Sequence, residues 1–164
     1  MEIVTYNFQF GLGQDGRIDL ERIAGEVNGT DIIVLQEIDY HRPRSDDVDQ
    51  AAKLGGLLNE YHWVYGSDFD VNASLPQPDV RIKNIRRQFG NMVLSKNPIL
   101  STRLVPLPKS NLYNLHVGVL EAVVGLQQGG ALRIYNTHLC ATSQRDRVAQ
   151  IIAMRDIIRR TPIA

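Results

Sequence analysis

Three residues whose side chains can bind a metal ion or a phosphate group, Asn7, Glu37 and His138, each end a segment with the character of a β-strand. Glu37 follows the apolar run Ile32–Leu35, and a mostly β-branched run bounded by polar residues is typical of a buried strand. A carboxylate next to such a strand needs a partner, because an isolated buried charge is very costly. We therefore expect the three side chains to form one site.

The residue types in this group favour phosphoester chemistry. A carboxylate and an amide oxygen suit a hard cation such as Mg²⁺ or Mn²⁺, which prefers oxygen ligands and keeps several waters. A histidine beside them suits a phosphoryl oxygen, to which it donates a hydrogen bond when protonated. Glu37 and Asn7 are therefore the candidate metal ligands, and His138 completes the candidate catalytic set.

Strand geometry gives a reason for these residues to meet. Side chains alternate along a strand, so Asn7, Glu37 and His138 each continue a mainly apolar face of their own segment. If the three strands lie side by side in the same sense, the three residues converge at one rim. Each residue also has a simpler interpretation: a salt-bridged surface glutamate, a turn asparagine and a structural histidine. The site hypothesis therefore depends on the combination.

The first half of the chain predicts strands alternating with helices, which suggests a sheet with helices packed on one face. Asp19 is a plausible N-cap for the first helix, whose apolar residues fall at helical spacing. Ser67–Arg87 has no clean period and contains two prolines, so it predicts a long surface loop. The predicted strands are Glu2–Asn7, Ile32–Glu37 and Trp63–Tyr65, and the predicted helices are Asp19–Asn28 and Asp46–Asn59.

The second half of the chain is mostly strand. Gln128-Gly129-Gly130 is a tight-turn signal that predicts a hairpin between the last two strands. The final helix is expected over Ser143–Arg160, with Arg147, Gln150, Ile151, Met154 and Ile158 on one face. The predicted strands are Phe89–Ser95, Ile99–Val105, Val117–Leu126 and Ala131–His138.

Composition places the chain among ordinary globular proteins. It has 164 residues, 43% hydrophobic and 22% charged, with 18 basic and 18 acidic side chains. This balance argues against binding nucleic acid by bulk charge, although a nuclease can bring its charge as bound metal. No apolar stretch approaches the roughly 20 residues that span a bilayer, and the start does not resemble a signal peptide. We take the cytoplasm as the default location, with secretion not excluded.

Several blocks of this sequence resemble the endonuclease/exonuclease/phosphatase superfamily, and they occur in the family's order over nearly the whole chain. The resemblance implies a four-layer α/β sandwich, with two mixed β-sheets flanked by helices, that hydrolyses phosphoesters with a divalent metal. On that pattern Glu37 matches the metal-binding glutamate, Asn7 the asparagine beside it, and His138 the histidine that assists phosphate binding. The blocks are Thr5–Asn7, Asp15–Ala24, Leu35–Asp39, Gly90–Ile99, Tyr135–Leu139 and Arg147–Gln150.

One departure from the family pattern limits what this chain is expected to do. The family continues with a strand carrying Gly-Asp-Phe-Asn and, much later, an Asp-His pair, and neither lies within residues 1–164. The resemblance therefore implies that residues 1–164 are the N-terminal portion of a single domain, incomplete at the C-terminus. On this interpretation the chain alone has little or no turnover, and its second sheet exposes an unpaired strand edge.

The substrate is less closely defined by the sequence. The Asn136-Thr137-His138-Leu139 form looks more like sphingomyelinase-type and deoxyribonuclease-like members than like abasic-site nucleases. Asn136 and Arg86, the latter in the cationic run Arg81–Arg87, are the candidate substrate-binding residues, although such a run is often only a solvated surface. The expected partner is a phosphorylated substrate: a lipid headgroup, a nucleic acid or a small phosphoester. No membrane span and no obligate protein partner are indicated.

Two other function classes compete with a phosphodiesterase or phosphatase. The first is a non-catalytic remnant that binds a phosphorylated ligand or partner without hydrolysing it. The missing aspartate, asparagine and histidine, if present downstream, would distinguish the enzyme from this remnant. The second, a serine-type hydrolase, is disfavoured because the sequence has no Gly-x-Ser-x-Gly elbow.

Overall fold

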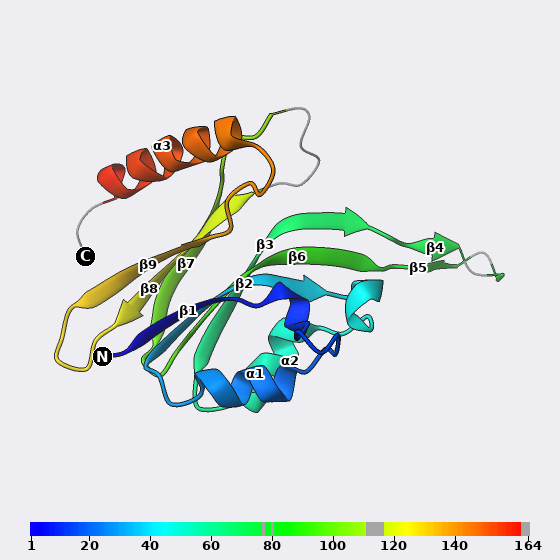
Figure 1. Cartoon of the computed structure of the whole chain (residues 1–164), viewed down its shortest axis with the longest axis horizontal. Helices are drawn as coiled ribbons and strands as arrows, with labels where there is room; N and C mark the ends of the chain where they lie inside the picture. The colour runs from blue at the N-terminus through cyan, green and yellow to red at the C-terminus, as the bar shows by residue number, and fades with distance from the viewer. Residues whose placement is uncertain (77, 80, 111–116, 162–164) are drawn as a thin grey trace.

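Two β-sheets pack face to face, and helices cover their outer faces (Figure 1). The computed structural model describes residues 1–76, 78–79, 81–110 and 117–161. The layers run helix, sheet, sheet, helix, which confirms the predicted four-layer α/β sandwich. The four-stranded first sheet contains, in spatial order, β1 (Ile3–Asn7), β2 (Ile32–Tyr40), β6 (Arg86–Ser95) and β3 (His62–Asn72).

The first sheet is mixed, because β1 pairs with β2 in parallel while β6 is antiparallel to both of its neighbours. Helices α1 (Leu20–Val27) and α2 (Gln50–Leu57) pack on its outer face and bury Leu35, Met92 and Leu94. The side chain of Asp19 accepts a hydrogen bond from the Arg22 amide, so the predicted N-cap is confirmed. Helix α2 is shorter than predicted, because Asp46 and Asp47 have positive φ after a 3₁₀ turn, η2 (Pro43–Ser45), and the N-cap of the helix is Asp49.

The second sheet contains β7 (Ile99–Pro106), β8 (Gly118–Gly125) and β9 (Ala131–Thr137). We expected a mixed sheet, but the described strands pair only in the antiparallel sense. The predicted β8–β9 hairpin is present, with Gly129 and Gly130 both at positive φ in its turn. The inner face of the second sheet packs on the first sheet through a core of Ile32, Val34, Val93, Leu120, Ala122 and Val124.

Helix α3 (Gln144–Arg160) covers the outer face of the second sheet and starts at the N-cap Ser143, as predicted. The predicted packing face is only partly right. Gln150 is fully buried and Met154 packs on the second sheet, but Ile151 and Ile158 are exposed. Apolar residues occur on more than one face of this helix, so their spacing alone did not identify the packed side. Among the described residues, no helix has both the length and the apolar character needed to cross a membrane.

The predicted loop Ser67–Arg87 is wrong. Strands β3 and β6 stay paired along their length, from His62 opposite Ser95 to Asn72 opposite Arg86. Beyond them, β4 (Leu75–Pro76) pairs with β5 (Ile82–Lys83). Together these strands form a two-stranded arm, described over residues 68–76, 78–79 and 81–87, that projects from the body of the molecule (Figure 1). Much of the arm is exposed, so its strands need no apolar alternation, which is the pattern that sequence reasoning detects.

Candidate functional site

Asn7, Glu37 and His138 meet at the rim between the two sheets, and we call these three residues the Glu37 site. The Asn7 Nδ2 donates a hydrogen bond to Glu37 Oε1 at 3.1 Å. The His138 Nε2 lies 3.4 Å from the same carboxylate oxygen. The Glu37 side chain is 17% exposed and that of His138 34%, so the site is open to solvent from one side. The predicted convergence is therefore present.

The convergence has a different origin from the one predicted. Asn7 ends β1, and β1 lies beside β2 in the first sheet, as expected. His138 follows β9, however, which belongs to the second sheet. The site thus forms across the space between two packed sheets, and not along the rim of one sheet.

Glu37 lies in a β-bulge and not at the end of its strand. The β2–β6 pairing passes from Leu35 opposite Met92 to Ile38 opposite Gly90, so two β2 residues stand opposite Asn91 alone. Glu37 has a φ of 64°, a left-handed conformation that costs a non-glycine residue free energy. A bulge redirects a side chain relative to a regular strand, and here the redirected side chain is the candidate metal ligand.

The loop after Asn7 is also strained. Gln9 and Phe10 both have positive φ, and the Gln9 amide donates to Asn7 Oδ1 at 3.0 Å. Backbone strain of this kind persists where the surrounding structure enforces it, and it concentrates at functional sites. The described non-glycine residues at positive φ all fall in the loops after β1 and β2 or in the β2 bulge: Gln9, Phe10, Glu37, His41, Asp46 and Asp47.

Asn136 is a positioning residue in this structure. It is 1% exposed, and its Nδ2 donates to the carbonyls of Leu35 and Met92 at 2.8 and 3.0 Å. Its Oδ1 accepts a hydrogen bond from Gln36 Nε2 at 2.8 Å. These bonds join β9 to the first sheet two residues before His138, so they fix the distance between His138 and Glu37. The amide is hydrogen-bonded inside the protein, and its predicted contact with substrate remains a prediction.

Arg86 lies on the arm and pairs with Asp70 across the two strands. Its Nε donates to Asp70 Oδ1 at 2.9 Å, and Nη2 lies 2.8 Å from Oδ2. No contact with the Glu37 site is found in the described part of the chain. Its predicted contact with substrate remains a prediction.

Sequence reasoning missed Asp68, a buried carboxylate in a bulge of β3 between Ser67 and Phe69. Asn91 Nδ2 donates to Asp68 Oδ2 at 2.7 Å, while Asp68 Oδ1 and Asn91 Oδ1 are buried without a hydrogen-bond partner. Burial raises the pKa of Asp68 to about 7, although the nearby Asn91 amide and Gly118 backbone offset part of the effect. A buried carboxyl that titrates near neutrality is a functional candidate.

Two signals in the sequence point to this second carboxylate. Asn91 lies in the family-like block that begins at Gly90, and it stands opposite the β2 bulge. Gly118 allows the close approach, because a Cβ there would lie 2.6 Å from Asp68 Oδ1. Asp68 itself was hidden because it falls in the segment predicted to be a loop.

The donor atoms of the Glu37 site fit a magnesium-like cation. In the described part of the chain, no group of three or more His, Cys, Asp and Glu side chains is placed to hold a metal ion. Mg²⁺ does not require such a group, since it is usually bound through one or two carboxylates and keeps several waters. Glu37 would supply a carboxylate, and Asn7 would supply its amide oxygen, Oδ1, which in this structure accepts a hydrogen bond from the Gln9 amide.

Comparison with known proteins identifies the family. The family model described as Endonuclease/Exonuclease/phosphatase family matches residues 4–162. The chain belongs to this family. The matched segment includes Asn7, Glu37 and His138. A comparison with curated proteins gave no match.

Solved structures of the endonuclease/exonuclease/phosphatase family share this fold. One from Beutenbergia cavernae is 24% identical with a TM-score of 0.74, over 98% of this chain and 44% of that one. TDP2 from D. rerio, solved with a single strand DNA product, is 17% identical with a TM-score of 0.69, over 99% and 56%. The 3′ phosphatase NExo from Neisseria, bound to product DNA hairpin, is 20% identical with a TM-score of 0.53, over 98% and 53%. The chain thus spans about half the length of these structures.

Proposed function

We propose that this protein is a metal-dependent phosphoester hydrolase, in which residues 1–164 supply the metal-binding side of the active centre. The observation that carries the proposal is the position of Glu37. Its carboxylate is bound by Asn7 from the same sheet and approached by His138 from the other sheet. Membership of the endonuclease/exonuclease/phosphatase family supports the same reaction class.

Each residue of the site has a separate role in this proposal. A divalent cation held by Glu37 and Asn7 would withdraw charge from the phosphoryl oxygens during hydrolysis. Asn7 Nδ2 orients the Glu37 carboxylate. His138, partly exposed beside it, can donate a hydrogen bond to a phosphoryl oxygen when protonated. Asn136 and the Glu37 bulge hold these groups at a fixed separation.

Phosphodiesters or phosphomonoesters of nucleic acid are the first substrates to test, because two of the similar structures were solved with DNA products. A lipid headgroup and a small phosphoester are the alternatives. The sphingomyelinase and deoxyribonuclease-like branch, inferred from Asn136-Thr137-His138-Leu139, remains part of the proposal. The proposal also includes that the residues that orient the nucleophile come from a further part of the same domain.

The test is hydrolysis of bis(4-nitrophenyl) phosphate and of labelled DNA by the protein in its longest reading frame, with Mg²⁺, Mn²⁺ or EDTA. Glu37→Gln removes the carboxylate charge, and we expect turnover to fall by at least about 1,000-fold, as when a metal ligand is lost. Glu26→Gln makes the same change at an exposed position of α1 and serves as the matched control.

Metal-dependent turnover that survives Glu37→Gln would overturn the site assignment. Absence of turnover in the longest reading frame, with the fold intact by circular dichroism, would overturn the hydrolase proposal. The non-catalytic binding protein would then be the better description.

A further inference from the structure

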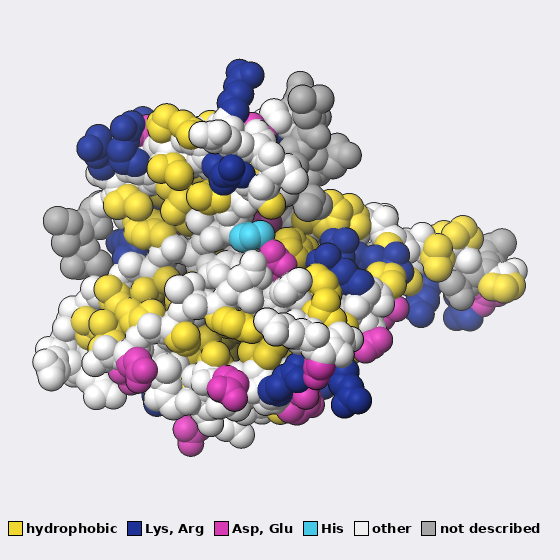
Figure 2. Space-filling model, in the orientation of Figure 1, with side chains coloured by type: hydrophobic (Ala, Val, Ile, Leu, Met, Phe, Trp, Pro, Cys, Tyr) yellow, Lys and Arg dark blue, Asp and Glu magenta, His cyan; other side chains and the backbone are white. Residues whose placement is uncertain are grey.

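Three arginines gather where the arm leaves the body of the molecule, and we call them the arginine cluster. Arg42 and Arg44 come from the loop after β2, and Arg87 comes from β6. Figure 2 shows basic side chains grouped in this region. The site proposed above does not use them, and their surroundings differ from those of a solvated charge run.

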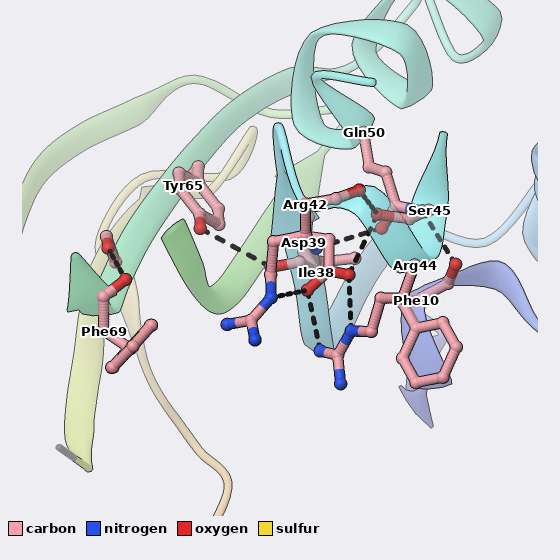
Figure 3. Close-up of polar contacts among 10 residues, drawn as sticks. Phe10, Ile38, Asp39, Arg42, Arg44, Ser45, Gln50, Tyr65 and Phe69 are labelled. Atoms are coloured by element: carbon pink, nitrogen blue, oxygen red, sulfur yellow. Dashed lines mark hydrogen bonds and ion pairs between the residues drawn. The ribbon is translucent and has the colours of Figure 1, made fainter. Parts of the chain in front are cut away.

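Only one of the three arginines is fully neutralised. Arg44 binds Asp39 through two parallel hydrogen bonds, Nε to Oδ2 and Nη2 to Oδ1, both at 2.8 Å (Figure 3). Asp39 is completely buried and also accepts a hydrogen bond from Ser45 Oγ at 2.9 Å. Arg42 Nε approaches the same carboxylate only to 3.8 Å. The single carboxylate is therefore already occupied by Arg44.

Arg87 is also poorly compensated. Its Nη2 lies 4.0 Å from Asp47 Oδ1, and the Asp47 side chain is 61% exposed, so this ion pair is weak. The Arg87 Nε is buried and has no hydrogen-bond partner. Within the described residues, neither Arg42 nor Arg87 donates a side-chain hydrogen bond. Guanidinium groups offer five donors each, so this pair retains most of its binding capacity.

Aromatic rings hold the cluster in place. The Arg42 guanidinium lies over Phe69 at 5.3 Å from the ring centroid, and that of Arg44 lies over Phe10 and Phe89 at 4.2 and 5.1 Å. Cation–π contacts of this kind orient a guanidinium without using its hydrogen-bond donors. Phe69 thus orients the Arg42 guanidinium while its donors remain available to a ligand, and Phe10 and Phe89 hold Arg44 against Asp39.

Positive charge is crowded at this point. Burial lowers the pKa of Arg42, and the neighbouring Arg44 and Arg87 charges lower it further, while Asp39 only partly offsets them. An arginine stays protonated in a protein, so the repulsion is not relieved by loss of a proton. A bound anion would relieve it.

The cluster faces the same side of the first sheet as the Glu37 site. Asp39 follows Glu37 by two residues, and Phe10 follows Asn7 by three. Along β6, Val93 packs between the sheets, and by alternation Asn91, Phe89 and Arg87 continue that face outward. Arg87 also borders an open hollow of about 500 Å³ with Tyr40, His41 and Lys83. This hollow leaves room for the part of a ligand beyond the cluster.

We propose that Arg42 and Arg87, with Arg44 holding the loop against Asp39, form a subsite for a second phosphate group of the substrate. This inference rests on the proposed function, because the first phosphate is the one hydrolysed at the Glu37 site. Paired guanidinium groups match the oxygens of a phosphate in planar, bidentate geometry. The protein therefore selects substrates with a phosphate beyond the scissile one, carried by a nucleic-acid strand or by a small bisphosphate.

The test is a binding measurement in EDTA on the protein in its longest reading frame. The probe is a short fluorescein-labelled oligothymidylate, measured by fluorescence anisotropy over a range of salt concentrations. We expect Arg87→Gln to weaken binding about tenfold, the loss typical of a hydrogen-bonded charge contact. The slope of log affinity against log salt should fall by about 1 for one lost phosphate contact. Arg42→Gln should act in the same direction.

Arg155→Gln is the matched control, because it removes the same charge from an exposed side chain of α3 that pairs with Asp156. We expect it to weaken binding less than about twofold, as for a rim charge without phosphate contact. If Arg155→Gln and Arg87→Gln weaken binding equally, the loss reflects only the general charge of the protein and the subsite is overturned. Thermal melts establish that each variant folds, and Arg42→Gln replaces Arg87→Gln if the latter does not.

Calorimetry with thymidine 5′-monophosphate and thymidine 3′,5′-bisphosphate identifies the source of the second phosphate. Loss of affinity for the bisphosphate in Arg87→Gln, without loss for the monophosphate, supports the subsite and assigns it to a small ligand. Loss confined to the oligothymidylate supports the subsite and assigns it to a strand. Equal loss for monophosphate and strand overturns it. Because no turnover is needed, failure here is distinct from failure of Mg²⁺-dependent hydrolysis.

Discussion

The two sheets of this protein treat a buried carboxylate in opposite ways. Asp68, whose partner Asn91 stands opposite the β2 bulge, contacts the uncharged Asn91 amide and Gly118 backbone, and among the described residues it forms no ion pair. Glu121, in the middle of β8, lies between two arginines, Arg103 from β7 and Arg133 from β9, with contacts of 2.7 Å to each. Arg103 also donates to Thr161 Oγ1 at 2.8 Å, just after α3 ends.

The partners determine which carboxyl stays ionised. Burial raises the pKa of Asp68 to about 7, and its hydrogen bonds do not restore the usual value. Burial also acts to raise the pKa of Glu121, but hydrogen bonds from Arg103 and Arg133 outweigh it and leave the pKa below its usual range. The Glu121 carboxylate, paired with two arginines, links β7, β8 and β9 to the end of α3. The Asp68 carboxyl has no such partner among the described residues, and it contacts Asn91, which stands opposite the Glu37 bulge. The pattern of partners therefore separates structural from functional carboxylates here.

Asp68→Asn should give the largest change in the stability profile. Because its folded pKa is raised to about 7, well above the usual value for an aspartate, the folded state holds a proton that the unfolded state releases between about pH 4 and 7. The free energy of unfolding of the native protein therefore falls as pH rises through this window, by up to about 4 kcal/mol, and levels off above it. Asp68→Asn should remove this fall.

Urea denaturation at pH 5 and pH 8 measures the difference between the two proteins. Groups common to both cancel when the profiles are subtracted. Parallel profiles for native protein and variant would show that Asp68 titrates normally, and the contrast with Glu121 would be lost.

His138→Ala should produce the next largest effect, on turnover. Loss of a positioned hydrogen-bond donor to the phosphoryl group typically costs about 100-fold or more. We expect Mg²⁺ affinity, measured by calorimetry, to be largely unchanged, because Glu37 and Asn7 are the proposed ligands. Loss of metal binding in this variant would make His138 a ligand and would assign it a different role in the site.

Glu121→Gln should have the smallest effect of the three, and on stability alone. Removing the carboxylate leaves Arg103 and Arg133 facing each other, but both are partly exposed, so we expect a loss of about 2 kcal/mol. Thermal and urea denaturation measure it. Turnover per folded molecule should not change. If the variant is as stable as the native protein, the ion pairs of Glu121 contribute little to stability. Pairing with arginines would then not distinguish a structural carboxylate from a functional one.

Local patterns in the sequence predicted that Asn7, Glu37 and His138 converge, whereas the layered fold was predicted from the family resemblance. The apolar run before Glu37, the Asp19 cap and the glycine turn at Gly129 each leave a direct mark in the sequence. Their counterparts in the structure are β2, the start of α1 and the β8–β9 hairpin.

The features that sequence reasoning missed depend on contacts between distant segments. Placing His138 on the second sheet requires knowledge of how the sheets pack, and this is fixed by the hydrogen bonds of Asn136 to Leu35 and Met92. Asp68 becomes a buried carboxyl only because an exposed segment, predicted as a loop, forms the continuation of β3. No local pattern contains either fact.

The bulge at Glu37 has a consequence for how this protein can change. Deleting one residue between Leu35 and Ile38 would let β2 pair regularly with β6 and would remove the left-handed backbone at Glu37. The resulting sheet would be better formed, yet the carboxylate would be lost or turned away from Asn7 and His138. Selection for stability alone thus favours an inactive sheet at this position, and only selection for the reaction preserves the irregular one.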